Sequence, residues 1–195
     1  MECAKILKSV AISRNLEGFR DAKGLRHLVR HWSHSFHTFF FSISELTITL
    51  EDVVNNFLLP VFDDENPINI SLFGKDLKVE DRLFSLFGGR TTSFRGKLAR
   101  MGKCVATLSQ EKEKMVRRAG FLTLWLSKFL FSEFPGYGIK STFFPLAIKL
   151  AKGVQYPLAP MFLGHVYSQL DLFHGDEVEG NSCYTITSSL YCAIL

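Results

Sequence analysis

The spacing of apolar residues changes within the first third of the chain, and the change predicts two different elements. Apolar residues spaced three and four apart predict a helix over "GLRHLVRHW", residues 24–32. Alternation in "FFFSISELTITL" then predicts a hairpin of two short strands around Ser44-Glu45. Its three consecutive phenylalanines suit a strand that is buried on both faces. We therefore expect Phe39, Phe40 and Phe41 to be core residues, with Leu46, Ile48 and Leu50 alternating toward one side of the hairpin.

The hairpin leads into a helix whose start and end are both marked. Thr49 is a good N-cap residue, and Asp52 stands where a capping-box partner belongs. Helical spacing continues through "LEDVVNNFLL" until Pro60, which cannot continue a helix. We predict a capped helix from Leu50 to about Leu58.

The rest of the chain predicts helices. A short one ends at Gly88-Gly89, a long one is capped by Ser109, and a third carries Pro145 in its first turn, where proline is tolerated. The basic stretch at 90–103 lacks a period and is predicted to be a loop. The predicted helical ranges are 79–87, 109–131, 141–152 and 157–173, with a last helix beginning near residue 185. The fold class is mainly α, a helical domain with a small N-terminal β-hairpin.

Composition and charge narrow the function classes. The chain has 195 residues, is 47% hydrophobic and carries a net charge of +4. Residues 51–80 carry seven acids and two bases, a net of −5, whereas residues 81–118 carry ten bases and three acids, a net of +7. The basic block is either a nucleic-acid face or a solvated surface that balances the acidic block. The apolar run at 119–131 contains Lys128 and is shorter than the roughly 20 residues of a membrane span, so it predicts a core helix.

The cysteines and the two ends bear on the cellular compartment. No two of the four cysteines form a C-x-x-C pair, and lysines and an arginine interrupt the N-terminal apolar stretch. These features favour a reducing compartment, cytosol or nucleus. The chain stops at Ile194-Leu195 inside an apolar pattern, so we expect the natural fold to continue. The cysteines are Cys3, Cys104, Cys183 and Cys192.

No constellation of residues predicts an active site. The histidines His27, His31 and His34 would share a face on one continuous helix, but no His-Glu-x-x-His is present, and Ser33–Ser35 should break the helix before His37. "GYGIKS" lacks the spacing of a phosphate loop, and no G-x-S-x-G is present. The acids at 63–65 and at 176–179 are predicted to face water. We expect no catalytic residue, no metal and no cofactor.

One long motif resembles a known family. Between residues 25 and 60 a Trp is followed by "HTFFF", then by "ELTITLEDV" and "LLP". This order resembles the plant mobile domain, also called the aminotransferase-like plant mobile domain, of the MAINTENANCE OF MERISTEMS-like (MAIN-like) and related transposon-borne proteins. The later stretches "RAGFLTLWLSKFLF", "FFPLAIKLAKG" and "LAPMFLGHVYSQL" resemble its helical body. The second His of the family's block is Phe40 here. The matching residues are Trp32, His37, Thr38, Phe39, Glu45, Thr47, Ile48, Thr49, Leu50, Asp52, Val53, Leu59 and Pro60.

The resemblance implies a domain organisation and a function. It implies an N-terminal lead at 1–24 and a plant mobile domain at 25–195, incomplete at its C-terminus, with a basic variable segment at 88–108. It implies a nuclear, non-catalytic interaction domain linked to meristem maintenance, transposon silencing and genome maintenance. It also implies a protein partner, in some relatives a phosphatase-like protein. From the short apolar run at 119–131 we expect no membrane partner.

The sequence favours three other functions less. Transaminase chemistry needs a Schiff-base lysine in a cofactor pocket, and Lys128, Lys140 and Lys149 lie in core-helix or helix-start patterns instead. The main alternative is a transposon-derived nucleic-acid-binding domain that uses the basic segment 82–118. A metal-dependent hydrolase using the histidines is the least favoured. The candidate nucleic-acid contacts are Arg90, Arg95, Lys97, Arg100 and Lys103.

Overall fold

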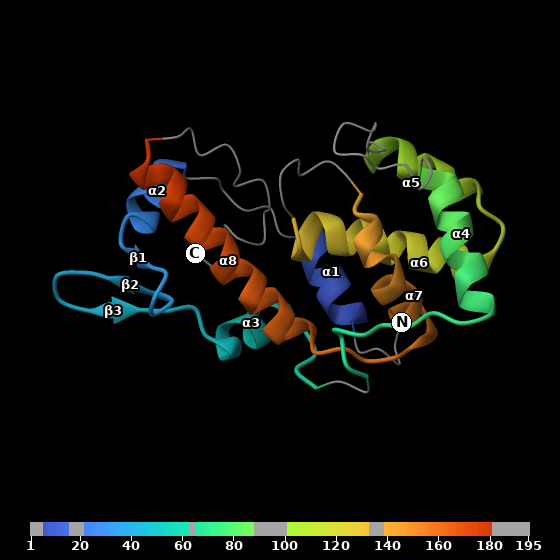
Figure 1. Ribbon diagram of the computed structural model, residues 1–195, viewed down its shortest axis with the longest axis horizontal. Helices are drawn as coiled ribbons and strands as arrows, with labels where there is room; N and C mark the ends of the chain where they lie inside the picture. The colour runs from blue at the N-terminus through green and yellow to red at the C-terminus, as the bar shows by residue number, and fades with distance from the viewer. Residues whose placement is uncertain (1–5, 16–21, 63–64, 88–100, 133–138, 181–195) are drawn as a thin grey trace. The chain divides into compact units, whose positions relative to one another are not determined.

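The described part of the protein is mainly helical with a small sheet near the N-terminus, as the sequence predicts (Figure 1). The computed structural model describes residues 6–15, 22–62, 65–87, 101–132 and 139–180. The chain divides into two compact units, each assembled from two stretches of sequence. The sheet unit comprises Lys8–Val61 and Pro157–Leu195, and the helical unit comprises Met1–Leu7 and Phe62–Tyr156.

The sheet unit is built around one long helix, α8, which comes from far along the chain. Helices α2 and α3 and strand β1 all pack against α8. The stripe Phe162, Val166, Leu170 and Phe173, spaced four, four and three apart, is the buried face of α8. The helices of this unit are α1 (Leu7–Asn15), α2 (Ala22–Val29), α3 (Leu50–Phe57) and α8 (Leu158–Val178).

The sheet has three antiparallel strands in the order β1 (Trp32–Ser33), β2 (Thr38–Phe40) and β3 (Glu45–Leu46). Trp32 pairs with Phe39, and Phe39 pairs with Leu46 across the central strand. The β2–β3 hairpin projects beyond the helices of the sheet unit (Figure 1). The sheet is therefore buried at its base around Trp32, and its tip is exposed.

The helical unit packs its central helix α6 against α7, with α4 and α5 beside α6. Leu122, Leu126, Ile148 and Leu150 are fully buried in this core. Gly120 on α6 lets Leu108 of α5 approach so closely that an added Cβ would collide with it. The elements of this unit are α4 (Lys75–Phe87), α5 (Met101–Gln110), α6 (Lys114–Trp125), the π-helix η1 (Leu126–Leu130), the 3₁₀ helix η2 (Ser141–Phe143) and α7 (Phe144–Lys152).

The long helix predicted from Ser109 is wrong in its boundaries. Ser109 lies near the end of α5, and α6 begins at Lys114. The Glu111 carboxylate accepts a hydrogen bond from the backbone N–H of Glu113 at 3.1 Å, which replaces a helical bond and ends the first helix. Residues 101–103, predicted to belong to the basic loop, lie within α5. Gly88-Gly89 and the last predicted helix fall outside the described residues.

The hairpin also differs from its prediction. Helix α2 ends at Val29, so Trp32 leaves the helical face and joins a strand that the sequence did not predict. Phe39 is buried, but Phe40 is exposed, so the strand is not covered on both faces. Leu46 is exposed while Ile48 is buried, which corrects the predicted apolar side of β3.

Candidate functional site

The sheet-to-α8 contact begins with a buried tryptophan. Trp32, 2% exposed, donates a hydrogen bond from its indole Nε1 to Oδ1 of Asp171 on α8 at 2.8 Å. Phe39 packs on the same indole, with ring centroids 4.8 Å apart. The bond joins residues 139 positions apart, so it fixes the sheet to a helix formed by the opposite end of the chain.

His37 meets the other side of the same carboxylate. Its backbone adopts a left-handed conformation with φ of 50°, at the bend before β2. Its ring stacks on Tyr167, with centroids 4.8 Å apart and planes 9° from parallel. Its Nε2 lies 3.9 Å from Oδ2 of Asp171. Asp171 therefore faces Trp32 with one carboxylate oxygen and His37 with the other.

Two threonines of the motif tie the strands together at their base. Thr38 donates to the carbonyl oxygen of Leu46 at 2.8 Å, and Thr47 donates to the carbonyl oxygen of His37 at 2.6 Å. The Thr47 hydroxyl also lies 3.5 Å from the Tyr167 hydroxyl, which donates to the carbonyl oxygen of Ile48 at 2.5 Å. Tyr167 thus holds both the ring of His37 and the strand that follows the hairpin.

The predicted capping box at the start of α3 is confirmed. Thr49 accepts a hydrogen bond from the backbone N–H of Asp52 at 3.2 Å, and the Asp52 carboxylate accepts from the backbone N–H of Thr49 at 2.8 Å. The Thr49 hydroxyl also donates to that carboxylate at 2.7 Å. These hydrogen bonds, the one from the Thr49 side chain above all, hold the pKa of Asp52 below its usual value.

These contacts define a structural cluster that the sequence motif only partly contains. The structure brings together Trp32, His37, Thr38, Phe39 and Thr47, whereas Glu45 lies exposed on β3. Sequence reasoning missed Tyr167 and Asp171, although their four-residue spacing on a predicted helix places them on one face. The motif-to-α8 cluster, as we call it, consists of Trp32, His37, Thr38, Phe39, Thr47, Tyr167 and Asp171.

Sequence reasoning also missed a polar cluster in the helical unit. The Glu65 carboxylate accepts hydrogen bonds from Lys149 Nζ at 3.0 and 3.2 Å and from the Tyr156 hydroxyl at 3.0 Å. The bond from Lys149, followed by that from Tyr156, lowers the pKa of Glu65. Burial, with the Glu65 carboxylate beside it, raises the pKa of Tyr156. Glu65 is exposed, as predicted, and it also binds Lys149 of α7.

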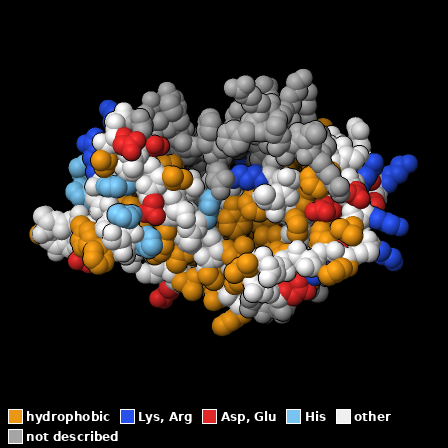
Figure 2. Space-filling view, in the orientation of Figure 1, with side chains coloured by type: hydrophobic (Ala, Val, Ile, Leu, Met, Phe, Trp, Pro, Cys, Tyr) orange, Lys and Arg blue, Asp and Glu red, His pale blue; other side chains and the backbone are white. Residues whose placement is uncertain are grey.

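The histidines do not share one helix. Because α2 ends at Val29, only His27 lies within it, and His31 follows it. The rings of His27 and His31 meet edge to face with centroids 5.3 Å apart, and His31 also contacts Phe41. Figure 2 shows histidine side chains on the surface of the sheet unit. Within the described residues, no group of three His, Cys, Asp or Glu is placed to hold a metal ion.

The candidate nucleic-acid contacts lie mostly outside the described residues. This applies to four of them and to the side chain of the fifth, Lys103, whose backbone belongs to α5. Within the described part of the basic segment, Arg82 pairs with the Glu111 carboxylate at 3.0 Å. The four undescribed residues are Arg90, Arg95, Lys97 and Arg100.

The fold and the cluster define a mainly helical domain whose motif residues fasten a small sheet to a helix. A family model described as the plant mobile domain matches residues 7–191. The chain belongs to the plant mobile domain family. No curated protein and no solved structure matches the chain significantly. Among the described helices, none combines the length and the apolar character that a bilayer crossing requires.

Proposed function

We propose that the chain is a non-catalytic, nuclear protein-interaction domain, linked to meristem maintenance, transposon silencing and genome maintenance as the family resemblance implies. One observation supports the proposal that the domain is non-catalytic. The polar side chains of the motif other than Glu45 are engaged in holding the sheet to α8, in closing the base of the hairpin or in capping α3. A catalytic motif would instead direct an acid, base or nucleophile toward a substrate.

The lysines support the same proposal. Lys140 donates to the carbonyl oxygen of Phe131 at 3.3 Å, and Lys149 is bound to Glu65. Lys128 is exposed and lies 5.0 Å from the ring centroid of Phe129. None of these settings resembles the pocket that a Schiff-base lysine needs. Burial also raises the pKa of the Cys104 thiol, which disfavours the thiolate that a nucleophile requires.

The test is affinity capture of the tagged full chain from plant nuclei, with and without nuclease. We expect the same proteins to be recovered after nucleic acid has been digested, a phosphatase-like protein being the class that the resemblance implies. Recovery of proteins only in the undigested sample would contradict a direct protein interaction. It would favour the nucleic-acid alternative instead.

The nucleic-acid alternative rests on the basic segment 82–118. Within its described part, Lys112, Lys114, Arg117 and Arg118 are exposed, and Lys and Arg side chains project from the helical unit in Figure 2. A DNA-binding surface would show a logarithmic affinity that falls with the logarithm of salt by about 0.9 per phosphate contacted. A shallow slope together with weak binding would leave the interaction domain as the better proposal.

A further inference from the structure

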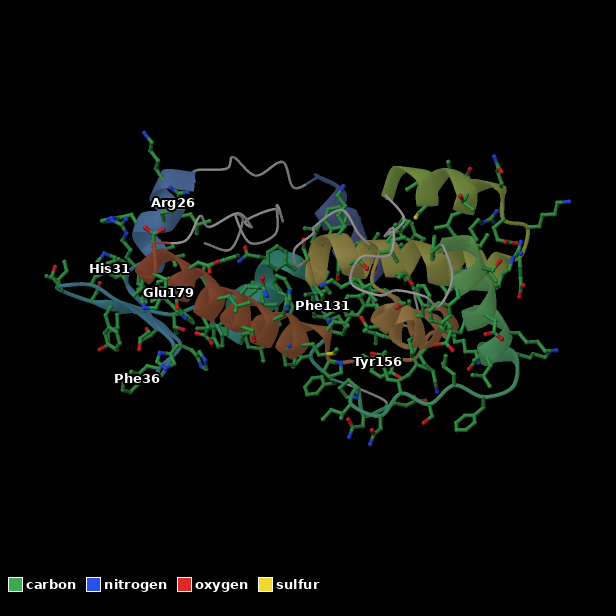
Figure 3. All side chains as sticks on the ribbon, turned by 45° about the horizontal axis from the view of Figure 1, so that its top comes forward. Arg26, His31, Phe36, Phe131, Tyr156 and Glu179 are labelled. Carbon is green, nitrogen blue, oxygen red and sulfur yellow. The ribbon has the colours of Figure 1, made fainter. Side chains whose placement is uncertain are left out.

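The β2–β3 hairpin and the loop before it display large apolar side chains. Ile43 at the turn is 94% exposed, Phe36 73%, Leu46 59% and Phe40 38%. Figure 3 shows Phe36 directed away from the helices of the sheet unit, and Figure 2 shows hydrophobic side chains on the surface of the hairpin. Single exposed apolar residues are ordinary, but four within eleven positions of one projecting element are a patch.

The patch covers both faces of the hairpin. Phe40 is paired with Glu45 and Phe39 with Leu46, and paired residues share a face while consecutive residues alternate. Phe40 and Leu46 therefore lie on opposite faces. The ring of Phe36 meets that of Phe40 edge to face, with centroids 5.9 Å apart, and so extends the Phe40 side. A flat partner surface would cover only one of these faces, whereas a groove would cover both.

The hairpin is held in place before any partner arrives. The hydrogen bonds of Thr38 and Thr47 close its base, and the Phe41 N–H bonds to the Ser44 carbonyl across the turn at 2.9 Å. A rigid element loses little conformational freedom on binding, which favours affinity.

Within residues 31–74, the stretch that contains the patch, the Lys, Arg, Asp and Glu side chains are all acidic, and Arg30 just before it pairs with Glu177. Residues 31–74 contain neither Lys nor Arg, and the acids closest in sequence to the hairpin are Glu45 on β3 and Glu51 and Asp52 at the start of α3. Two such hairpins would bring like charges together, which disfavours a second copy as the occupant. A partner with Lys or Arg beside its apolar surface would complement them.

The exposed apolar area of the patch is similar to the apolar area that one partner buries in a standard protein–protein interface. Taking about 200 Å² for each large apolar side chain, the four exposed fractions correspond to about 500 Å². A standard interface buries about 800 Å² on each partner, of which about 60% is apolar. The patch would thus supply nearly all of the apolar part, with the acidic residues in the rim.

We propose that the hairpin inserts into an apolar groove of a partner protein whose rim carries Lys or Arg. This inference rests on the proposed interaction function and adds the surface and the chemistry of the partner. Phe36, Phe40, Ile43 and Leu46 enter the groove, and Glu45 meets its basic rim.

Site-specific photo-crosslinking in plant nuclei tests the insertion. A benzophenone amino acid replaces Ile43 in the full chain, and a control chain carries it at Val178, which is 69% exposed at the end of α8. We expect position 43 to crosslink far more strongly than position 178, to apolar residues of another protein that are flanked by Lys or Arg. Crosslinks to nucleic acid, to a second copy or within the chain, or none above the control, would overturn the proposal.

The binding affinities of surface variants give a matched quantitative test, measured with the purified partner protein that the crosslinking identifies. Ile43→Ser should weaken binding about tenfold or more, because the complex loses the favourable free energy of burying the isoleucine side chain in the groove. Glu45→Lys should weaken binding at low salt and much less at 1 M salt, since screening removes the charge effect. Val178→Ser should bind like the wild type. Should Ile43→Ser melt abnormally, Phe36→Ser replaces it.

The capture experiment separates the two proposals. If Ile43→Ser and Phe36→Ser, both folded, still recover every nuclease-resistant partner, the hairpin proposal is wrong while the interaction domain stands. If no nuclease-resistant partner is recovered by the wild type, the interaction function itself fails.

Discussion

Asp171 offers the sharpest test of the motif-to-α8 cluster. We compare Asp171→Ala with Asp171→Asn, because these variants remove the same charge but only the first removes the acceptor. The indole N–H of Trp32 lies 2.8 Å from Asp171 Oδ1 in a site where Trp32 is almost completely buried. Asparagine presents a carbonyl oxygen at the same position, so the indole keeps a partner.

The two variants should therefore differ in stability. A buried donor left without an acceptor costs about 1–3 kcal/mol, so Asp171→Ala should lower the free energy of unfolding of the sheet unit by about 2 kcal/mol. Asp171→Asn should cost less than about 1 kcal/mol, because it loses only the charge on the hydrogen bond and the contact with the partly exposed His37.

Tryptophan fluorescence can follow each unit by itself. The chain has two tryptophans, Trp32 in the sheet unit and Trp125 in the helical unit. In a Trp125→Phe background, urea unfolding monitored by fluorescence reports the environment of Trp32. Circular dichroism of the same samples checks whether the two units unfold together.

A double-mutant cycle with Trp32→Phe decides whether the hydrogen bond is responsible. Phenylalanine has no N–H, so Asp171→Ala should cost about 1–2 kcal/mol less in that background than in the wild type. Equal losses for Asp171→Ala and Asp171→Asn, or a coupling energy near zero, would refute the proposed role of the bond.

Four further predictions concern other parts of the chain. Phe39→Ala should cost about 3–5 kcal/mol because its buried ring leaves a cavity, whereas the exposed Phe40→Ala should cost less than about 1 kcal/mol; urea melts with equal losses would contradict the observed burial. Thr49→Ala should cost about 1 kcal/mol through loss of the cap, and Thr49→Ser should recover most of it in the same assay. Glu65→Gln should destabilise the helical unit at neutral pH. The folded-state pKa of Glu65 is lowered, so its carboxylate contributes to the free energy of unfolding fully above its unfolded-state pKa, and this contribution disappears as the pH falls through the folded-state pKa. A stability difference between wild type and Glu65→Gln that is independent of pH would count against this. Neutralising the five candidate nucleic-acid contacts should leave the affinity for duplex DNA unchanged in a fluorescence-anisotropy titration. A steep dependence of affinity on salt that these changes abolish would instead favour DNA binding. The five contacts are Arg90, Arg95, Lys97, Arg100 and Lys103.

The parts of the fold that local sequence controls were predicted best. The capping box of α3 depends on residues three apart, and α7 carries Pro145 in its first turn and is followed by the C-cap residue Gly153, whose φ is 99°. Each signal acts through the backbone of its own neighbours, so the sequence nearby is sufficient.

The parts that depend on distant residues were not predictable in the same way. Trp32 has suitable helical spacing, yet its indole is buried through contacts with Phe39 and with Asp171, 139 residues away. Likewise, the sequence predicts that Glu65 is exposed, but it does not predict its hydrogen bonds with Lys149 and Tyr156. The motif resemblance identified the sheet half of the cluster, and only the fold supplied its α8 half.

The split arrangement of the sheet unit has a consequence for synthesis on the ribosome. Thr47 and its neighbour Tyr167 are 120 residues apart, and the intervening chain contains the main stretch of the helical unit. At about 5–20 residues per second, the hairpin leaves the ribosome about 6–24 s before the helix that covers Trp32. During that interval the apolar residues of the sheet have no α8 to pack against, and the helical unit is completed only when Tyr156 has emerged. The nascent chain is therefore most open to chaperones and to misassociation at its N-terminal sheet, and substitutions in α8 should affect yield as much as stability.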